Sequence, residues 1–300
     1  MRKSIVLFAG AALAAASFSA AAAEPCRYSA PRDAELDAAG LKLLSVEIGP
    51  DDLTIRGQPG LTKIVVHGTA CASNEKWLQD VKVETARHGD TASVVARDGD
   101  RGITFSLFGG SYAYLKLDVR VPQSVAVKLK EGSGDAAAAN LASLDASLGS
   151  GDLKVNGIAG ELALGVGSGD VVGNDVGSVN LSGVSSGDVH VDGVRGDAHA
   201  GSVGSGDFGL RNVKGSVSVG SVSSGDVKLA GVGGNVTVGS VGSGDVTIEQ
   251  AGGSVRADSV GSGDFGADGV GGDFSVGSLG SGDIHHRRVK GKVSIPRTGD

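Results

Sequence analysis

A tetrad of glycine, serine and aspartate returns nine times between residues 132 and 283. It reads Gly-Ser-Gly-Asp or Ser-Ser-Gly-Asp, and successive aspartates are 17, 18, 18 and then five times 19 residues apart. A fixed short period is the mark of a repeat architecture, in which each copy is one structural unit. The nine aspartates are Asp135, Asp152, Asp170, Asp188, Asp207, Asp226, Asp245, Asp264 and Asp283.

Each copy of the repeat contains two short stretches of alternating apolar residues. In the copy after Asp226 the first stretch runs from Val227 to Val232 and the second from Val236 to Val241. A period of two residues is typical of a β-strand, and the stretches are too brief for an amphipathic helix. Glycines cluster between them, where we expect turns whose positive φ angles would penalise a Cβ atom. The pattern therefore predicts that each copy forms a strand, a turn, a second strand and a second turn.

A single copy buries too little apolar surface to fold alone, so the copies must stack. Successive strands that run in one direction with a crossover between them are parallel, and such crossovers are almost always right-handed. The register is supported by Phe208, Phe265 and Phe274, which all fall at core-facing positions. The sequence thus predicts an all-β fold, a right-handed parallel β-helix (β-solenoid) of about nine rungs of 17–19 residues.

Residues 1–23 have the composition of a signal peptide. Arg2 and Lys3 precede an apolar run from Ile5 to Phe18, and Ala21–Ala23 follow it. The run is shorter than a full membrane span and ends at small residues suited to cleavage. We therefore predict export with cleavage before Glu24, to the periplasm, the cell surface or the medium of a bacterium. We expect no transmembrane segment in the mature chain.

The two cysteines of the chain, Cys26 and Cys71, both lie outside the repeats. An exported chain meets an oxidising compartment, where such a pair commonly forms a disulfide. A zinc site or a catalytic thiol would need further partners, and His67 is a lone candidate ligand near Cys71. We therefore predict a Cys26–Cys71 disulfide.

Residues 24–130 are expected to form a strand-rich amino-terminal cap, and residues 131–300 to form the repeat solenoid with a basic terminal rung. Residues 24–40 have the character of a lead-in. A helical turn is expected at Ser73–Asp80, with Ser73 or Asn74 as its cap. The expected strands of the cap are Leu43–Ile48, Leu53–Arg56, Lys63–His67, Val81–Thr85, Ala92–Ala96, Ile103–Leu107, Tyr114–Val121 and Val125–Leu129.

Charge is unevenly distributed along the repeats. Residues 132–283 hold 18 acidic and six basic residues, whereas residues 284–300 hold five basic residues and one acidic residue. An acidic rod is a poor partner for nucleic acid. In the terminal rung, the basic residues either block an open sheet edge against other chains or bind an acidic partner or an anionic envelope surface. These residues are Arg287, Arg288, Lys290 and Lys292.

If the copies stack in register, the nine aspartates stand about 5 Å apart in one column. Like charges that close are unfavourable unless they are hydrogen-bonded or shared with cations. Our first interpretation is structural, with each carboxylate accepting N–H bonds from its own glycine-rich turn. The alternative is a row of calcium ions, but the calcium β-roll repeat places its aspartate every nine residues. We therefore expect neither a metal site nor a cofactor site.

An enzyme is the second class to weigh, because some parallel β-helices cleave acidic polysaccharides. Glycosidase chemistry needs one distinct pair of carboxylates in a cleft, whereas these carboxylates are repeated copies. The repeats contain no Trp or Tyr to stack on sugar rings. We expect His190 and His199 on different strands, and His285 and His286 on opposite faces of one strand, so neither pair forms a persuasive catalytic or metal site. We expect no catalytic residues.

The segment from Tyr114 to Asp135 reads Tyr-Leu-Lys-Leu-Asp-Val-Arg-Val-Pro-Gln-Ser-Val-Ala-Val-Lys-Leu-Lys-Glu-Gly-Ser-Gly-Asp and is followed by repeated Gly-Ser-Gly-Asp-Val. This pattern resembles the bacterial "putative adhesin" domains of unknown function, a family of β-strand repeats that includes the head GIN domain. The resemblance covers roughly residues 40–300. It implies an exported β-solenoid of the bacterial envelope with an adhesin-like role, and it brings no catalytic motif.

Together these observations predict a non-enzymatic, exported β-solenoid that acts as an adhesin-like binding or structural module of the cell envelope. Its partner is then an envelope glycan or a surface protein. A self-assembling envelope scaffold is the first alternative, because a basic terminal rung can meet an acidic flank of another copy. A polysaccharide-acting β-helix enzyme is the second.

Overall fold

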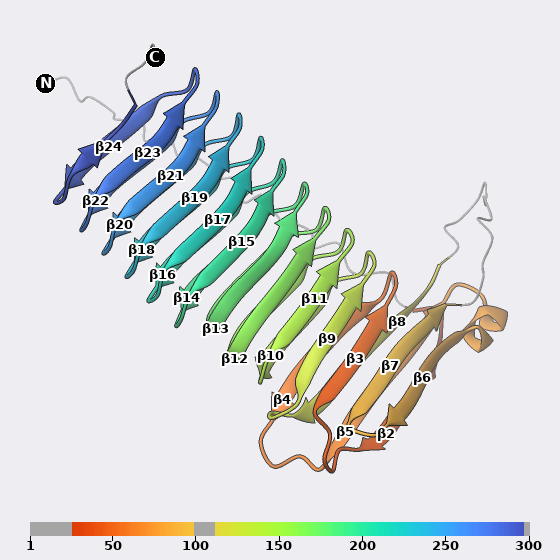
Figure 1. The fold of residues 1–300 in the computed structure, drawn as a ribbon. Coiled ribbons are helices and arrows are strands. Elements are labelled where there is room, and N and C mark those ends of the chain that lie inside the picture. Colours follow the sequence, from red (N-terminus) through yellow and green to blue (C-terminus); the bar gives the residue numbers. More distant parts are fainter. Residues whose placement is uncertain (1–25, 99–111, 297–300) are drawn as a thin grey trace, which may run out of the picture.

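The computed structural model describes residues 26–98 and 112–296. These residues form a rod of stacked rungs with a less regular β-rich region at its amino-terminal end (Figure 1). Within the described ranges, one short 3-10 helix accompanies the strands. The predicted all-β solenoid is confirmed. The predicted signal peptide and the expected strand Ile103–Leu107 lie outside the described residues.

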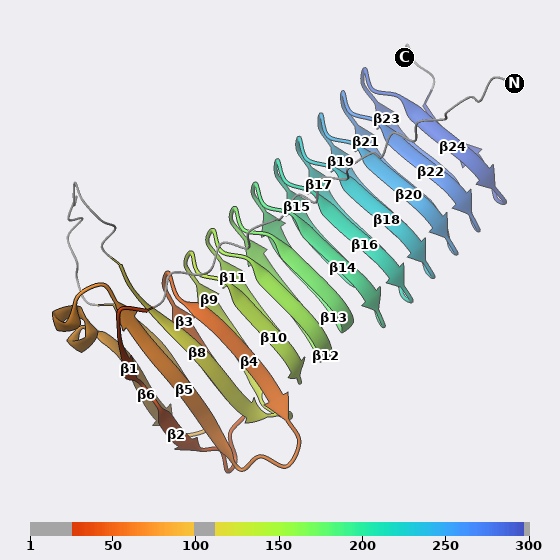
Figure 2. The ribbon, with the colours of Figure 1, turned by 180° about the vertical axis from the view of Figure 1, so that it is seen from behind.

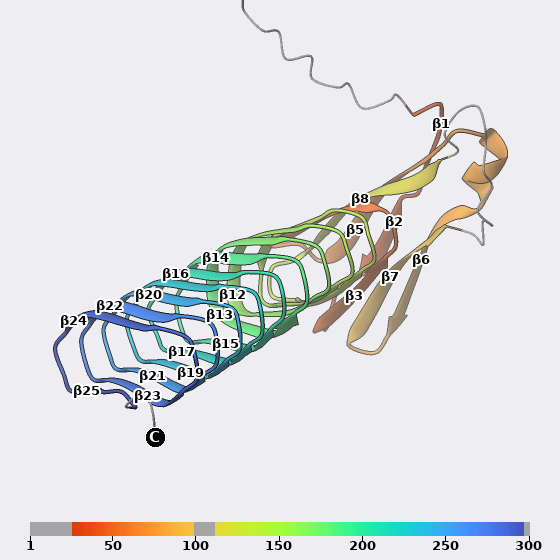
Figure 3. The ribbon, with the colours of Figure 1, turned by 90° about the horizontal axis from the view of Figure 1, so that it is seen from above.

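Along the repeats, the strands of one continuous sheet form two facing stacks, which we call wall A, after the aspartate tetrad, and wall B, after the second turn. All strand pairs of the repeats are parallel, and Figure 3 shows the rungs as nested loops. Two rungs are each a single long strand that runs through both walls, β12 (Leu153–Val166) and β13 (Val171–Val184). In the other rungs the wall A and wall B strands are β10 (Ala136–Leu141) and β11 (Leu144–Leu148), β14 (Val189–Val194) and β15 (Ala198–Val203), β16 (Phe208–Val213) and β17 (Val217–Val222), β18 (Val227–Val232) and β19 (Val236–Val241), β20 (Val246–Ala251) and β21 (Val255–Val260), β22 (Phe265–Val270) and β23 (Phe274–Leu279), and β24 (Ile284–Val289) and β25 (Val293–Ser294).

Equivalent side chains of successive copies lie on top of one another. β16 pairs with β18 so that Phe208 faces Val227, and β18 pairs with β20 so that Val227 faces Val246. The main-chain N–H of Val227 donates to the carbonyl oxygen of Asp245 in the next rung at 2.8 Å. The predicted column of equivalent positions is therefore confirmed.

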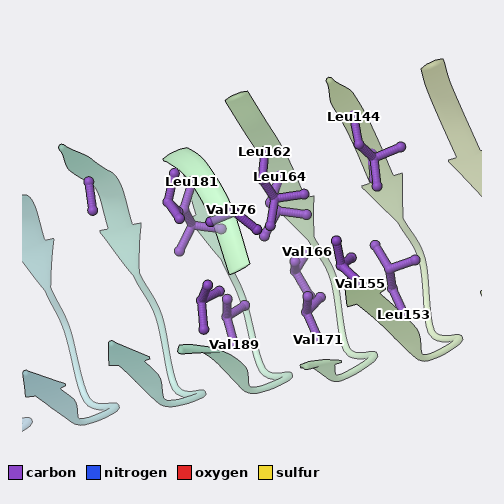
Figure 4. Packing of buried hydrophobic residues seen from close by; sticks show 14 of the residues in the cluster. Leu144, Leu153, Val155, Leu162, Leu164, Val166, Val171, Val176, Leu181 and Val189 are labelled. Carbon is purple, nitrogen blue, oxygen red and sulfur yellow. The ribbon is translucent and has the colours of Figure 1, made fainter. Parts of the chain in front are cut away.

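The core is a column of aliphatic side chains between the two walls, shown close up for β11 to β14 in Figure 4. The three phenylalanines of the repeats, Phe208, Phe265 and Phe274, are fully buried, as the sequence predicts. Two of them, Phe265 and Phe274, face each other across the walls with ring centroids 5.8 Å apart. Aliphatic burial that is continuous along the rod compensates for the small core of each rung.

Every wall A strand of the repeats bends at its fifth residue, a feature that the sequence analysis did not foresee. That residue has a positive φ angle between 48° and 79° in all nine copies. The bend interrupts the two-residue alternation, so the buried positions fall at the first, third and sixth residues of the strand. The residues at the bend alternate between glycine and other types: Asn140, Gly157, Asp175, Gly193, Asn212, Gly231, Gln250, Gly269 and Arg288.

The stack continues past residue 131 into the amino-terminal region. β3 (Leu43–Ile48) lies between β7 (Thr91–Asp98) and β9 (Ala126–Glu131) in wall B, as Figure 1 shows. β4 (Asp52–Gln58) lies between β8 (Ala113–Pro122) and β10 in wall A, as Figure 2 shows. All four of these pairings are parallel. The β3–β4 rung is thus inserted between strands that follow it by many residues in the chain.

Antiparallel strands close this end of the rod. β5 (Lys63–Ala72) pairs with β8 in wall A, and β6 (Val81–His88) pairs with β7 in wall B. The other edge of β5 is covered by β1 (Tyr28–Pro31) and β2 (Ala34–Asp37). These two strands correct the expectation of a lead-in at residues 24–40, whose short alternation we did not interpret as strands. The expected cap strands that fall in described residues are all present.

Two local features tie the cap together. The expected helical turn is a 3-10 helix, η1 (Glu75–Gln79), and the side chain of Asn74 caps it by accepting the N–H of Lys76 at 3.1 Å. Cys26 and Cys71 form the predicted disulfide, with their Cα atoms 5.5 Å apart. This bond fixes the start of the described chain to β5. No helix in residues 26–98 or 112–296 has the length and apolar character needed to cross a membrane.

Candidate functional site: the two turn ladders and the open edge

The nine tetrad aspartates form a ladder of hydrogen bonds between rungs. In each step, Oδ1 of one aspartate accepts the main-chain N–H of the aspartate in the next rung, at 2.8–3.3 Å. The donor is therefore the next copy, which corrects our expectation that each carboxylate accepts N–H groups of its own turn. One oxygen of each carboxylate, except that of the last, Asp283, is committed to holding the rod together.

The glycine before each aspartate is required by the spacing of the rungs. A Cβ atom on Gly225 would lie 1.9 Å from the carbonyl oxygen of Gly206, and one on Gly244 would lie 1.9 Å from that of Gly225. These glycines do not have positive φ angles, so our explanation of the tetrad glycines by positive φ was wrong. The backbones of neighbouring turns approach so closely that no side chain fits between them.

A second ladder runs along the turn that precedes wall B. Asp197 Oδ1 accepts the N–H of Ser216 at 2.8 Å, Ser216 Oγ accepts that of Asn235 at 3.1 Å, and Asn235 Oδ1 accepts that of Ser254 at 2.8 Å. The series continues through Asp273 to Lys292. Sequence reasoning missed it because no single residue type fills the position, which is aspartate, serine or asparagine from copy to copy. The signal was a short side chain with an acceptor oxygen at every nineteenth position.

A lysine and a histidine lie beside carboxylates of the aspartate ladder at two places. The Lys228 ammonium lies between Asp207 and Asp226, 3.6 and 3.7 Å from one oxygen of each. At the corresponding position of the last rung, His285 lies beside Asp264 and Asp283, with ligand atoms of the three within 4.8 Å of one another. This group could hold a metal ion, although the sequence analysis assigned none here. His285 and Asp283 are exposed to solvent.

The other histidines are placed as the sequence predicts, on different strands. His190 is on β14 in wall A and His199 is on β15 in wall B. His199 Nδ1 lies 2.8 Å from Ser218 Oγ of the next rung. His190 borders a shallow hollow of about 470 Å³ on wall A, together with the exposed Val172 and with Gly209, whose missing side chain deepens it. Basic and acidic residues both line this hollow, so its charge favours no class of ligand.

A buried carboxyl marks the seam between the cap and the repeats. Glu131, the last residue of β9, pairs with Ile48 on one side and Leu148 on the other, at a position that the later rungs fill with aliphatic residues. Its side chain is 3% exposed, and neither oxygen makes a hydrogen bond of good geometry among the described residues. Burial raises the pKa of Glu131 to about 7, and the main-chain N–H groups of Gly134, Gly149 and Gly151 oppose this shift only in part. In the sequence, this site could have been found from the glutamate at a repeat position where the later rungs have aliphatic residues.

The carboxyl-terminal end of the rod has an open edge. Among the described residues, β24 is paired only with β22, and β25 is paired only with β23. Four basic residues lie there, and Arg288 pairs with Asp268 at 2.8 Å. The side chains of the other three, Arg287, Lys290 and Lys292, have no acidic partner within the described chain. The structure thus brings three unneutralised cations to an unpaired sheet edge.

Several solved structures are similar to this chain at low sequence identity. A "putative adhesin" from Bacteroides fragilis is 14% identical over 91% of this chain and 99% of its own, with a TM-score of 0.38. A "putative adhesin" from Parabacteroides distasonis is 14% identical over 89% of this chain and 97% of its own, with a TM-score of 0.44. A "putative lipid binding protein" from the same species has a TM-score of 0.40 at the same identity. At such identities and scores, these names say nothing of the ligand of this chain.

No curated protein matches this sequence. A family model does, from residue 46 to residue 269, which spans the β3–β4 rung and the repeats as far as β22. The match therefore covers most of the chain, and it includes the inserted rung as well as the repeats. The chain therefore belongs to the Toastrack DUF4097 family.

Proposed function

We propose that this chain is a non-enzymatic, exported β-solenoid that acts as an adhesin-like binding module of the bacterial envelope. The observation that carries the proposal is the aspartate ladder. Its carboxylates are the most frequent reactive groups of the repeats, and each of the eight that has a following rung gives one oxygen to that rung's backbone. Because these carboxylates repeat in every rung and stabilise the fold, we assign them a structural role. We therefore expect the binding site among residues that do not repeat.

The same geometry argues against a polysaccharide-acting enzyme. The carboxyl whose pKa is raised to about 7 is that of Glu131, which faces the core instead of a cleft. General acid–base cleavage needs such a group at the substrate, with a second carboxylate at a set distance. We expect no release of reducing ends when the purified chain is incubated with acidic polysaccharides. Activity that survives purification and disappears on Glu131→Gln would contradict the proposal.

Export is tested by fractionation. The Cys26–Cys71 disulfide fits an oxidising compartment, and the signal peptide expected at residues 1–23 leads to the same compartment. We expect the protein in the periplasm, on the surface or in the medium, with Glu24 as its first residue. A chain that is found in the cytosol and still starts at Met1 would contradict this part of the proposal.

Binding is tested on whole cells. A strain that lacks this chain and a strain that overproduces it are compared for retention on immobilised envelope glycans and on envelope surface proteins. We expect retention to follow the amount of chain on one of these supports. Equal retention of both strains on every support would remove the adhesin-like role and leave a structural one.

The self-assembling scaffold remains as the second candidate function, since the basic terminal edge and the acidic repeats have opposite charges. Assembly by these charges weakens as salt rises, because salt screens exposed groups. Light scattering of the purified chain at low and high salt distinguishes the two candidates. A binding module stays monomeric at both, whereas a scaffold forms large particles at low salt.

A further inference from the structure

The two ends of the rod differ in whether the last strand of wall A has a further strand paired to its edge. At the amino-terminal end, wall A is covered by β5, and β5 in turn by β1 and β2. At the carboxyl-terminal end, nothing in the described chain follows β24 and β25. In the preceding rung, the N–H of Phe265 donates to the carbonyl oxygen of Asp283. The equivalent donor of the last rung is the N–H of Ile284, and no further rung of the described chain supplies a carbonyl oxygen to accept it.

The first ladder ends in a form that can accept one more strand. Asp283 donates its N–H to Asp264 Oδ1 at 3.0 Å, as every earlier aspartate does. Its own carboxylate accepts no N–H within the described chain, because no tenth aspartate follows in the repeats. The second ladder ends instead in Lys292, whose side chain has no acceptor oxygen. An added strand therefore fits beside wall A and not beside the end of the second ladder.

The end of the core is partly exposed at the same place. Phe274 is fully buried, but Ile284 and Val289 are only half-buried, and Val293 is 43% exposed. The inward-facing position that holds Leu229 or Ile248 in earlier rungs holds His286 in the last, with its ring 5.5 Å from that of Phe274. The apolar column therefore ends at this rung, with Ile284 and Val289 left for an added strand to cover.

We propose that the β24 edge binds an acidic, extended segment of a partner protein, which adds to wall A as a further strand. This inference deepens the proposed binding function and names its site and the class of its partner. Main-chain hydrogen bonds to β24 supply the pairing, as in other cases of strand addition. Acidic side chains of the segment neutralise Arg287 and Lys290, and alternate apolar side chains cover Ile284 and Val289.

Charge disfavours pairing of the β24 edge with a strand edge of a second copy. Two β24 edges brought together would place two sets of Arg287, Arg288, Lys290 and Lys292 against each other, with no acidic residue between residues 284 and 292 to offset them. The free edges at the other end are β6 in wall B, which carries Lys82, Arg87 and His88 beside its one acidic residue, Glu84, and β1 and β2 in wall A. β2 carries Glu35 and Asp37, but these carboxylates already pair with Lys63 and Arg87 of the same chain. Neither end of a second copy therefore supplies an unneutralised acidic strand of the kind that the β24 edge fits.

The test uses the purified full mature chain and a fluorescent decapeptide that alternates valine with aspartate or glutamate. Its affinity is measured by fluorescence anisotropy at physiological salt, beside a peptide with lysine in place of the acidic residues and a scrambled acidic peptide. We expect saturable binding of the alternating acidic peptide. Equal binding of the scrambled peptide would overturn strand addition, because then charge alone explains the binding.

Pairing through the backbone is tested with two N-methylated forms of the acidic peptide, one methylated at the odd and one at the even amides. Alternate residues of a strand present their amides to opposite edges, and pairing with one neighbour uses one set. We expect one form to lose binding and the other to keep it. Equal effects of the two forms would overturn the proposal.

The repeats offer a matched control for the basic residues. Arg211 and Lys214 occupy the positions of Arg287 and Lys290, four 19-residue copies earlier, in a rung that is paired on both sides. We expect R287E/K290E to weaken peptide binding about tenfold, and R211E/K214E to change it less than about twofold. Circular dichroism and a thermal melt verify that both variants are folded.

Equal effects of the two double variants would overturn the site, since binding would then follow the net charge. Light scattering of the free chain tests whether a second copy occupies the edge. We expect a monomer, and dimers that dissociate in the R287E/K290E variant would show that the occupant is a second copy. Failure of peptide binding leaves the whole-cell retention and fractionation results unchanged. The proposal for the edge and the proposed function can therefore fail separately.

Discussion

The turn before wall A and the turn before wall B are both joined from rung to rung by a main-chain N–H that donates to a side-chain oxygen. Before wall A the acceptor is always aspartate, within an almost constant tetrad. Before wall B it is aspartate, serine or asparagine, in sequences that share little more than a preceding glycine. The hydrogen bond alone thus does not demand aspartate. The constancy of the first turn comes from its glycine, where neighbouring backbones are in closest approach.

The largest effect is expected from the glycine of the first turn. In Gly225→Ala the new Cβ would lie 1.9 Å from the carbonyl oxygen of Gly206, and the backbone must shift. We expect a loss of about 3–5 kcal/mol in the free energy of unfolding, measured by urea titration. The matched variant of the second turn is Gly234→Ala, where the new Cβ would lie 2.4 Å from the side-chain atom Ser216 Oγ and 3.0 Å from the nearest backbone atoms, those of Gly215. We expect a smaller loss there, because the backbone itself has less far to move. Equal losses would break the comparison.

The next effect concerns Glu131, which leads into the first tetrad turn. Its folded pKa of about 7 lies above its ordinary value of 4.5, so the folded chain binds this proton more tightly than the unfolded chain. Its contribution to stability is therefore greatest at low pH, falls as pH rises from 4.5 to 7 and is constant above. The loss amounts to about 3 kcal/mol.

Glu131→Leu restores the aliphatic residue of the other rungs. We expect this variant to be more stable than the wild type at pH 8, and the difference between the two to shrink by about 2–3 kcal/mol on going to pH 5. Urea titration at both pH values provides the measurement. A difference that does not depend on pH would show that Glu131 has an ordinary pKa.

A smaller effect tests whether the two ladders are equivalent. Asp245 accepts the N–H of Asp264 at 2.8 Å, and Asn235 accepts that of Ser254 at 2.8 Å. We expect Asp245→Ala and Asn235→Ala to cost about 1–2 kcal/mol each, because each leaves one N–H without its acceptor. Asp245→Asn retains an acceptor and is expected within about 0.5 kcal/mol of the wild type. Thermal melts at fixed salt make the comparison.

The smallest effect concerns the bend in wall A, which tolerates several residue types as the second turn does. Gln250 has φ +62° and Gly231 has φ +69° at equivalent positions. We expect Gln250→Gly to stabilise by about 0.5 kcal/mol, since the strain of the left-handed region outweighs the entropy of glycine. Gly231→Ala is expected to cost about 1 kcal/mol. A Gln250→Gly variant that melts below the wild type, or a Gly231→Ala variant that melts above it, would contradict this account of the bend.

The repeats were predictable to the level of individual core residues because burial imposes a period on the sequence. Phe208, Phe265 and Phe274 illustrate this, since only a core position accommodates such side chains in so thin a rod. The second ladder was not predictable from residue identity, because its requirement is one oxygen atom that three residue types can supply. The bend was hidden for the same reason, as glycine shares it with asparagine, aspartate, glutamine and arginine.

The cap was predictable in its strands but not in its connections. The strand runs around Leu43–Ile48 and Tyr114–Val121 show the alternation that burial on one face imposes. Nothing in that alternation says that β3 pairs with β9 or that β4 pairs with β10, because such long-range pairing depends on the whole core. The exposed edge was visible in the charge of residues 284–292, whereas its unpaired backbone needed the structure.

The order of strands at the seam has a consequence for how the chain matures. The β3–β4 rung belongs to the first 60 residues, yet β9 and β10, which cover it toward the repeats, end at residues 131 and 141. If the chain crosses a membrane from its amino terminus, as proposed, the side of this rung that faces the repeats stays uncovered until more than 70 further residues have crossed. Closing so distant a contact is slow compared with adding a rung to its neighbour. Assembly of the seam, and not growth of the rod, is then the step that sets the pace at which the protein becomes resistant to proteases.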